Sequence, residues 1–252
     1  MAPLNGAAQK PVISVTRGDD HYAIAADWLP EPLIYANEAD AVCAFFVQLL
    51  TAHSQSRPDL LLLHAGAAAI AGKLVVFPAS GNIGKSTLTA VLAAKGCMIF
   101  SDDALPLSLA RGTGSALGIG PRPRLPLPVS LSPATRTFIE SNIGLSNRNF
   151  AYLALPNTVG GLAPRGAELA IGAFVIPDRA ANATDEPHLM PASSAETMAQ
   201  LIGQHLGKRL PARQMVEKLA EMTGRIPCWR LRYSNVEQAA DFLLANPDFT
   251  AQ

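Results

Sequence analysis

Charged side chains are scarce in this sequence, and the two signs balance. They make up 16% of the 252 residues, against roughly 25% in an average soluble domain. The 20 basic and 20 acidic residues cancel to a formal charge of zero. This balance argues against the broad positive surface that wraps nucleic acid or binds anionic membranes, so we expect neither partner. The hydrophobic content of 49% excludes a disordered chain.

Cysteines and long apolar runs are also few. Cys43, Cys97 and Cys228 lie far apart and form no C-x-x-C pair, which disfavours a disulfide framework or a zinc site and favours buried thiols in a reducing compartment. The longest apolar stretch, residues 60–70, is interrupted by His64 and is far shorter than the ~20 residues that span a bilayer. Because the opening residues contain no apolar signal-peptide region, we expect a cytoplasmic protein.

The length favours one elaborated domain over two. We expect residues 1–58 to form a β-rich extension with one helix, packed on the core, and residues 59–248 to form the core. Short β-type runs separated by Gly, Asp and Pro predict the strands of the extension, and Asn37 can cap its helix. The expected elements are strands over 12–15, 22–25 and 33–36 and a helix from Asn37 to about His53.

The core begins with strands and a helix in the order of a βαβ unit, which predicts an α/β fold. The expected elements are strands over 60–65, 67–70 and 74–78, a helix over 84–95 closed by Gly96, and a strand over 97–100. A Gly- and Pro-rich stretch, 112–133, predicts an irregular loop. Apolar periodicity and capping signals predict the remaining elements. These are a strand over 169–176 followed by a polar loop over 177–187, a helix from the Ser193 capping box, a helix from Pro211 with Gly224 just past its end, a strand over 228–233 and a helix over 236–243.

Residues 79–87 read Ala-Ser-Gly-Asn-Ile-Gly-Lys-Ser-Thr and match the phosphate-binding P-loop, except that Ala79 replaces the first glycine. A phosphate chain needs inward N–H groups, a helix N-terminus, a lysine for the terminal phosphates and a hydroxyl for Mg²⁺. Lys85 and Ser86 supply the last two, and an apolar strand precedes the loop as the motif requires. The expected phosphate-contacting residues are Ser80, Gly81, Asn82, Ile83, Gly84, Lys85, Ser86 and Thr87.

Asp102 and Asp103 follow the next predicted strand. If that strand lies beside the P-loop strand, both carboxylates lie near the terminal phosphate, where one can join a Mg²⁺ shell through water and the other can accept a proton. A helix cap or a simple metal pair is the alternative. His64 stands in an apolar run, where a histidine is usually a core residue. Four arginines could stabilise a transferring phosphoryl group, although each alone is typical of solvated surface: Arg122, Arg124, Arg148 and Arg165.

Taken together, His64-Ala65-Gly66, the P-loop with its lysine, and Ser101-Asp102-Asp103 resemble the HPr kinase/phosphorylase family of bacterial serine kinases, most of all its short relatives, over residues 60–110. These relatives include kinases of lasso-peptide precursors. The resemblance implies a P-loop kinase core with a mixed β-sheet flanked by helices, and an ATP- and Mg²⁺-dependent transfer to a serine hydroxyl of a peptide or small protein. It also implies roles for residues: Lys85 on the phosphates, Ser86 on Mg²⁺, Asp103 as the catalytic base, and His64 organising the phosphate site. Asp102 is then the carboxylate of the pair that we expect in the Mg²⁺ shell.

Some features depart from the family pattern. Residues 112–133 contain no clear match to the family's second acidic signature, which leaves one metal ligand unassigned, and Thr87 follows Ser86 where an acidic residue is usual. Two alternatives therefore stay open: a small-molecule kinase on the same core, and a regulatory module that binds nucleotide without transferring phosphate. Larger members of the family are hexamers, but this shorter chain need not be, so a homo-oligomer stays one open alternative.

Overall fold

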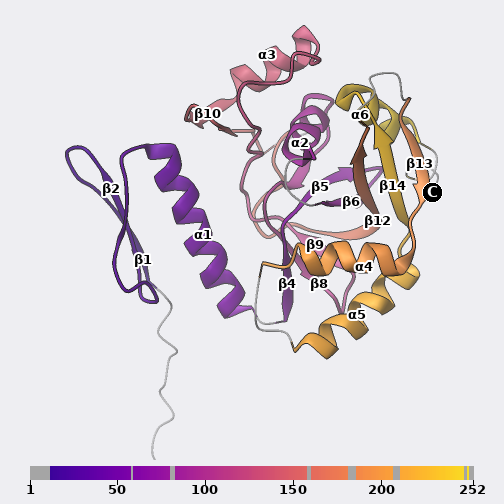
Figure 1. Cartoon of the computed structure of the whole chain (residues 1–252), viewed down its shortest axis with the longest axis horizontal. Helices are drawn as coiled ribbons and strands as arrows, with labels where there is room; N and C mark the ends of the chain where they lie inside the picture. The colour runs from indigo at the N-terminus through magenta and orange to yellow at the C-terminus, as the bar shows by residue number, and fades with distance from the viewer. Residues whose placement is uncertain are drawn as a thin grey trace, which may run out of the picture. The chain divides into compact units, whose positions relative to one another are not determined.

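The computed structural model describes residues 12–57, 59–79, 83–157, 160–180, 186–206, 211–246 and 249. The chain divides into two compact units, residues 1–56 and 57–252, which are described separately. Both are visible in Figure 1. Within the described residues, no helix combines the length and the apolar character needed to cross a membrane.

The N-terminal unit is a three-stranded antiparallel meander with one helix. Its elements are β1 (Ile13–Arg17), β2 (Tyr22–Ala26), β3 (Leu33–Tyr35) and α1 (Glu38–Ser56), with strand order β1-β2-β3. The predicted cap is confirmed, because Asn37 Oδ1 accepts a hydrogen bond from the N–H of Ala39 at 2.8 Å. Ile24 from β2 packs with Ala41 and Ala44 from α1, so apolar residues of the helix and the sheet form this unit's small core.

The second unit contains a mixed β-sheet flanked by helices, which confirms the predicted α/β fold class. The strands run in the order β4-β8-β9-β12-β6-β5-β7, and β14 and β13 extend the sheet beside β12. Their bounds are β4 (Leu60–Leu63), β5 (Ala65–Ile70), β6 (Lys73–Pro78), β7 (Ile99–Ser101), β8 (Leu105–Ser108), β9 (Thr113–Ser115), β12 (Glu168–Arg179), β13 (His188–Pro191) and β14 (Cys228–Tyr233).

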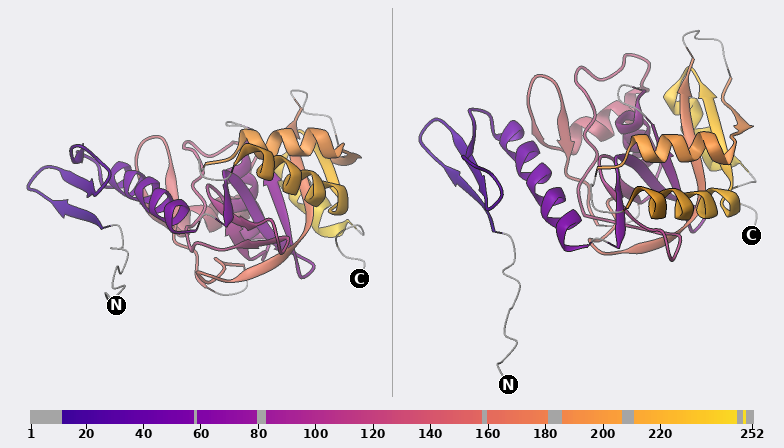
Figure 2. Two further views of the ribbon diagram at one scale, coloured as in Figure 1. Left: turned by 90° about the horizontal axis from the view of Figure 1, so that it is seen from below. Right: turned by 60° about the horizontal axis from the view of Figure 1, so that its bottom comes forward.

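Helices cover both faces of this sheet (Figures 1 and 2). Because alternate residues of a strand point to opposite faces, Val75 and Phe77 of β6 join one core, whereas Leu74 and Val76 join the other. The first core includes residues of α2 (Lys85–Ala94) and α6 (Val236–Ala245). The second includes residues of α4 (Ser194–Gly203) and α5 (Ala212–Arg225). The apolar character of β6 thus follows from burial on both faces.

The order of the strands corrects one expectation about the site. The strand that ends at the aspartate pair, β7, does not lie beside the P-loop strand β6, because β5 runs between them. Since β5 is antiparallel to both, β6 and β7 run in the same direction and end at the same edge of the sheet. The tight turn that sends the chain back from β5 to β6 is confirmed, with positive φ at both Ala71 and Gly72, as a two-residue hairpin turn requires.

Other boundaries differ from the prediction for local reasons. The strand expected over 169–176 continues to Arg179 because β14 pairs with it in parallel to that point. Gly224 lies inside α5, which ends at Arg225 where Ile226 adopts an extended conformation. The stretch 112–133 contains the short β9, and the helix and hairpin after it were not predicted: α3 (Pro133–Ser141), β10 (Ile143–Ser146) and β11 (Ala151–Leu153). The three cysteines are free thiols, but of the three only Cys97 is buried as expected, whereas Cys43 and Cys228 are partly exposed.

Candidate active site

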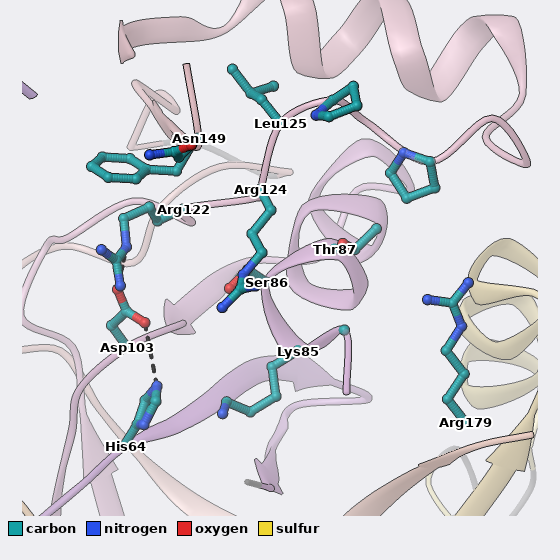
Figure 3. Close-up of a pocket in the computed structure, with 14 residues that line it drawn as sticks. His64, Lys85, Ser86, Thr87, Asp103, Arg122, Arg124, Leu125, Asn149 and Arg179 are labelled. Atoms are coloured by element: carbon teal, nitrogen blue, oxygen red, sulfur yellow. Dashed lines mark ion pairs between the residues drawn. The ribbon is translucent and has the colours of Figure 1, made fainter. Parts of the chain in front are cut away.

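The start of α2 forms the floor of a cleft (Figure 3). Gly84 adopts a left-handed conformation, with φ of 98°, which turns the chain from the loop into the helix and which few residues other than glycine adopt readily. The first N–H groups of the helix, from Lys85 to Thr87, have no acceptor within the helix. They therefore offer hydrogen bonds and the positive end of the helix dipole to an anion. Ser80, Gly81 and Asn82, which were predicted to contact phosphate, lie outside the described residues.

Lys85, the first residue of α2, is buried at the bottom of the cleft. Only 7% of the residue is exposed, and its Nζ donates a hydrogen bond to the carbonyl of Ala79 at 2.8 Å. Burial lowers the pKa of Lys85, and the negative charges of Asp102 and Asp103 act against that shift. A buried ammonium that gives one bond to a carbonyl keeps two N–H groups for a ligand.

Tyr233, at the end of β14, supports the loop from below, a role that the sequence prediction missed. Its hydroxyl donates a hydrogen bond to the carbonyl of Ile83 at 3.2 Å, and it lies 3.5 Å from where a Cβ on Gly84 would stand. Burial raises the pKa of Tyr233 to about 12, so the hydroxyl stays protonated and remains a donor at neutral pH. The sequence predicts residue 233 only as the last residue of a strand.

Asp102 lies beneath the first turn of α2. The residue is 1% exposed. Its Oδ1 accepts a hydrogen bond from the Thr89 hydroxyl at 3.0 Å and its Oδ2 accepts one from the N–H of Arg122 at 2.8 Å, and Ser86 also hydrogen-bonds to the carboxylate. Burial and the neighbouring charge of Asp103 raise its pKa, and these hydrogen bonds partly offset that rise.

Asp103 points into the cleft, between a histidine and an arginine. Its Oδ1 lies 3.4 Å from Nε2 of His64, and its Oδ2 lies 2.9 Å from Nε of Arg122. Burial raises the pKa of this carboxyl, but the hydrogen bonds and charges of His64 and Arg122 outweigh burial and the pKa is lowered. Asp103 is therefore an ionised acceptor at the surface of the cleft, with 25% of its side chain exposed.

His64 is held in place by backbone hydrogen bonds as well as by its contact with Asp103. It follows β4, and its N–H donates to the carbonyl of Gln204 at 2.8 Å, while Leu206 N–H donates to Leu62 at 2.8 Å. The short segment after α4, residues 204–206, thus pairs with the chain around Leu63 and fixes the backbone next to the imidazole. The structure brings together three of the residues singled out in the sequence: His64, Lys85 and Asp103 all line one cleft.

The structure separates the four arginines that the sequence could not rank. Arg122 and Arg124 line the cleft, whereas Arg148 and Arg165 are exposed and do not. The Arg122 guanidinium lies over the rings of Phe150 and Tyr152, 5.1 and 5.7 Å from their centroids. A guanidinium whose flat face lies against aromatic rings hydrogen-bonds through its N–H edge, as Nε of Arg122 does to Asp103. Arg122 is held in this way between β11 and the aspartate pair.

The cleft has a volume of about 630 Å³. In Figure 3, Lys85, Ser86 and Thr87 lie between the His64–Asp103 pair on one side and Arg179 on the other. Arg179, at the end of β12, is exposed and is another cation that sequence reasoning did not single out. The lining residues are His64, Gly84, Lys85, Ser86, Thr87, Asp103, Arg122, Arg124, Leu125, Pro126, Pro128, Asn149, Phe150 and Arg179.

The residues present fit a phosphate chain with Mg²⁺. Mg²⁺ keeps several waters and takes few protein oxygens beside those of the phosphates, so the Ser86 hydroxyl with the Asp102 carboxylate close behind it is a sufficient donor set. Both oxygens of Asp102 already accept hydrogen bonds. Asp102 is therefore suited to contact a water bound to the metal rather than the metal itself. Among the described residues, no three His, Cys, Asp or Glu side chains are grouped to hold a metal by themselves.

No protein-family model matches the sequence, and no curated protein matches it. Among solved structures, the chain is similar to that of the Hpr(Ser) kinase/phosphatase from Coxiella burnetii, with a TM-score of 0.38 and 14% sequence identity. The likeness covers 73% of this chain and 93% of that chain. At this identity the roles of individual side chains have to be inferred from their contacts in this protein.

Proposed function

We propose that this protein is an ATP- and Mg²⁺-dependent kinase that transfers the γ-phosphoryl group to a serine hydroxyl of a peptide or small protein. One observation carries the proposal: the ionised Asp103 carboxylate and the buried Lys85 ammonium open onto the same cleft, at the N-terminus of α2. An anion-binding floor next to a fixed carboxylate is the arrangement that phosphoryl transfer to a hydroxyl needs.

In this proposal the floor binds the triphosphate. The N–H groups at the start of α2 and the Nζ of Lys85 hydrogen-bond to the β- and γ-phosphates. Ser86 would hold Mg²⁺ and Asp102 would hold a water bound to it, and the metal would supply positive charge near the terminal phosphates. Arg122 and Arg124 add cations on the acceptor side, where a loose, charge-spread transition state gains most from them.

Asp103 acts on the acceptor. Its carboxylate accepts the proton of the serine hydroxyl as the new O–P bond forms and the bond from the γ-phosphorus to the departing ADP breaks. His64 and Arg122 contact one oxygen each and so orient the carboxylate. Phosphoserine and ADP are the products.

The test is transfer to defined acceptors. The protein is incubated with ATP, Mg²⁺ and a set of serine-containing peptides, and mass spectrometry identifies any peptide that gains one phosphate. Lys85→Ala should abolish the product, whereas Lys73→Ala, which removes an exposed lysine at the start of β6, should not. Mg-ATP binding without transfer to any peptide would contradict the proposal and favour the non-transferring regulatory module, and phosphate gained only by small alcohols would favour the small-molecule kinase.

A further inference from the structure

The outer wall of the cleft is not used by the phosphate chemistry. Leu125, Pro126 and Pro128 line it, and Figure 3 places Leu125 away from Lys85, on the far side of Arg124, whose side chain extends toward Ser86. The wall therefore divides into a cationic part near the phosphates and an apolar part beyond them. Next in the chain is Val129, which is 98% exposed.

Val129 lies outside the cleft and continues its apolar wall. It is the most exposed of the large hydrophobic residues in the described part of the chain, and it follows directly on Pro128, a residue of the cleft. A single exposed valine is ordinary on a protein surface. Here the valine extends an apolar strip, residues 125, 126, 128 and 129, from the reaction site into solvent, whereas Leu127 between them points into the core and is 7% exposed.

This strip is held in place before any ligand binds. The N–H of Leu125 donates to the carbonyl of Asn149 at 2.8 Å, and Nη2 of Arg136 donates to the carbonyl of Pro128 at 2.8 Å. Just beyond, the N–H of Ser132 donates to Oε1 of Glu237 on α6 at 2.8 Å. Prolines at 126 and 128 further restrict the backbone. A pre-formed surface spares a partner the entropic cost of ordering it.

We infer that residues 125, 126, 128 and 129 form a docking strip for the peptide segment that flanks the phosphorylated serine, and that this strip selects an apolar side chain next to that serine. The inference rests on the proposed function and deepens it by naming the acceptor class. An acceptor confined to the cleft would not reach Val129, whereas an extended peptide that leaves the cleft along this wall would. The apolar lining favours an uncharged flank, because burying a charge against it without a partner is costly.

Paired measurements on peptides of one length test the inference. Each peptide carries a central serine and differs only in flanking residues, which are leucine, glutamate or lysine. Binding to the full chain with Mg²⁺ and a non-hydrolysable ATP analogue is followed by fluorescence anisotropy, and phosphate transfer from ATP is measured in parallel. We expect the leucine-flanked peptide to bind wild type at least about fivefold more tightly than the charged peptides.

Val129→Asp is the decisive variant because a fully exposed position tolerates substitution with little effect on folding. The substitution should weaken binding of the leucine-flanked peptide at least about fivefold and should strengthen binding of the lysine-flanked peptide. The affinity for Mg-ATP should stay unchanged. Val216→Asp on α5, another exposed valine, serves as the matched control and should change neither. General destabilisation of the protein would not make it bind the lysine-flanked peptide more tightly.

One result would overturn the inference and leave the proposed function intact: Val129→Asp keeps the wild-type preference for every peptide while both proteins transfer phosphate to peptides. A wild-type protein that binds none of the peptides and transfers phosphate only to a small alcohol would overturn both the inference and the peptide acceptor, in favour of the small-molecule kinase. Failure of phosphoryl transfer itself would look different, as a wild-type protein that binds no Mg-ATP or never transfers phosphate. In that case the anisotropy measurement, repeated without nucleotide, still decides whether the strip binds an apolar peptide.

Discussion

The Nε atom of Arg122 lies 2.9 Å from Oδ2 of Asp103, and the rings of Phe150 and Tyr152 support the same guanidinium from one side. The backbone N–H of Arg122 also bonds to Asp102. One residue thus connects the acidic pair after β7 to the hairpin strand β11. In the proposed reaction, this arginine would share its charge between the carboxylate and the transferred phosphoryl group.

Arg122→Ala should therefore slow transfer more than it weakens nucleotide binding. The variant loses a charged hydrogen bond to the proposed base, and such bonds are worth about 1.5–3 kcal/mol, so we expect kcat to fall about 10- to 100-fold. Arg122→Lys keeps the charge but not the planar contact with the rings, and it should recover only part of the loss. Steady-state kinetics measure the split between kcat and KM. Arg111→Ala, which breaks an exposed pair with Glu168, is the control, and an equal effect from it would refute the special role of Arg122.

Tyr233→Phe tests the support beneath the phosphate loop. The substitution removes only the hydroxyl that bonds to Ile83, a neutral hydrogen bond typically worth about 0.5–1.5 kcal/mol. We expect the dissociation constant for Mg-ATP, measured by calorimetry, to rise about two- to tenfold, with kcat at saturating ATP changed less. Tyr35→Phe in β3 of the other unit should leave the affinity unchanged. A Tyr233→Phe protein with wild-type affinity would show that the loop is positioned without this bond.

Much of this site could be anticipated from the sequence because its chemistry is local in the chain. Lys85 and Ser86 belong to one continuous motif, and Asp102 and Asp103 follow a strand whose apolar residues mark it plainly. Tyr233 and Arg179 were missed because they reach the site through parallel pairing of β12 with β14, a contact between distant segments that no local pattern reports. The interposition of β5 between β6 and β7 was missed for the same reason.

The segment from 112 to 165 was the least predictable part of the fold. Its elements are short: α3 has 9 residues, and β10 and β11 have 4 and 3. Elements this short contain too few repeats of apolar residues for a helical or an alternating pattern to be recognised in the sequence. Their stability depends instead on tertiary contacts such as that between Ser132 and Glu237, and the choice of Arg122 over Arg148 depends on the same packing.

Glu237 gives a stability prediction that is separate from activity. Burial raises the pKa of its carboxyl, but hydrogen bonds from Thr135 and Ser132 outweigh burial, so the pKa is lowered. A carboxylate whose pKa is lower in the folded state stabilises the protein above its unfolded pKa, near 4.3, and loses that effect as pH falls through the folded pKa. Because solvent screens this partly exposed carboxyl, Glu237→Gln should reduce the free energy of unfolding by less than about 1 kcal/mol at neutral pH.

Urea unfolding at several pH values measures this effect. The difference between wild type and Glu237→Gln should be largest at neutral pH and should shrink as the pH falls below about 4. Glu221→Gln removes an exposed ion pair with Arg225 on α5. It should lower the free energy of unfolding by less than about 0.5 kcal/mol. A difference for Glu237→Gln that does not depend on pH would show that the ionised carboxylate is not what ties α3 to α6.

Asp103→Asn is the most direct test of the proposed chemistry. The amide keeps the size of the side chain but removes the basic carboxylate, and loss of a general base typically costs about 10²- to 10⁴-fold. Phosphate transfer to a peptide acceptor at saturating ATP should fall by that factor while Mg-ATP still binds within about twofold of wild type, and Asp241→Asn, at an exposed pair on α6, should keep full transfer. An Asp103→Asn protein that transfers phosphate at the wild-type rate would contradict the assignment of Asp103 as the base.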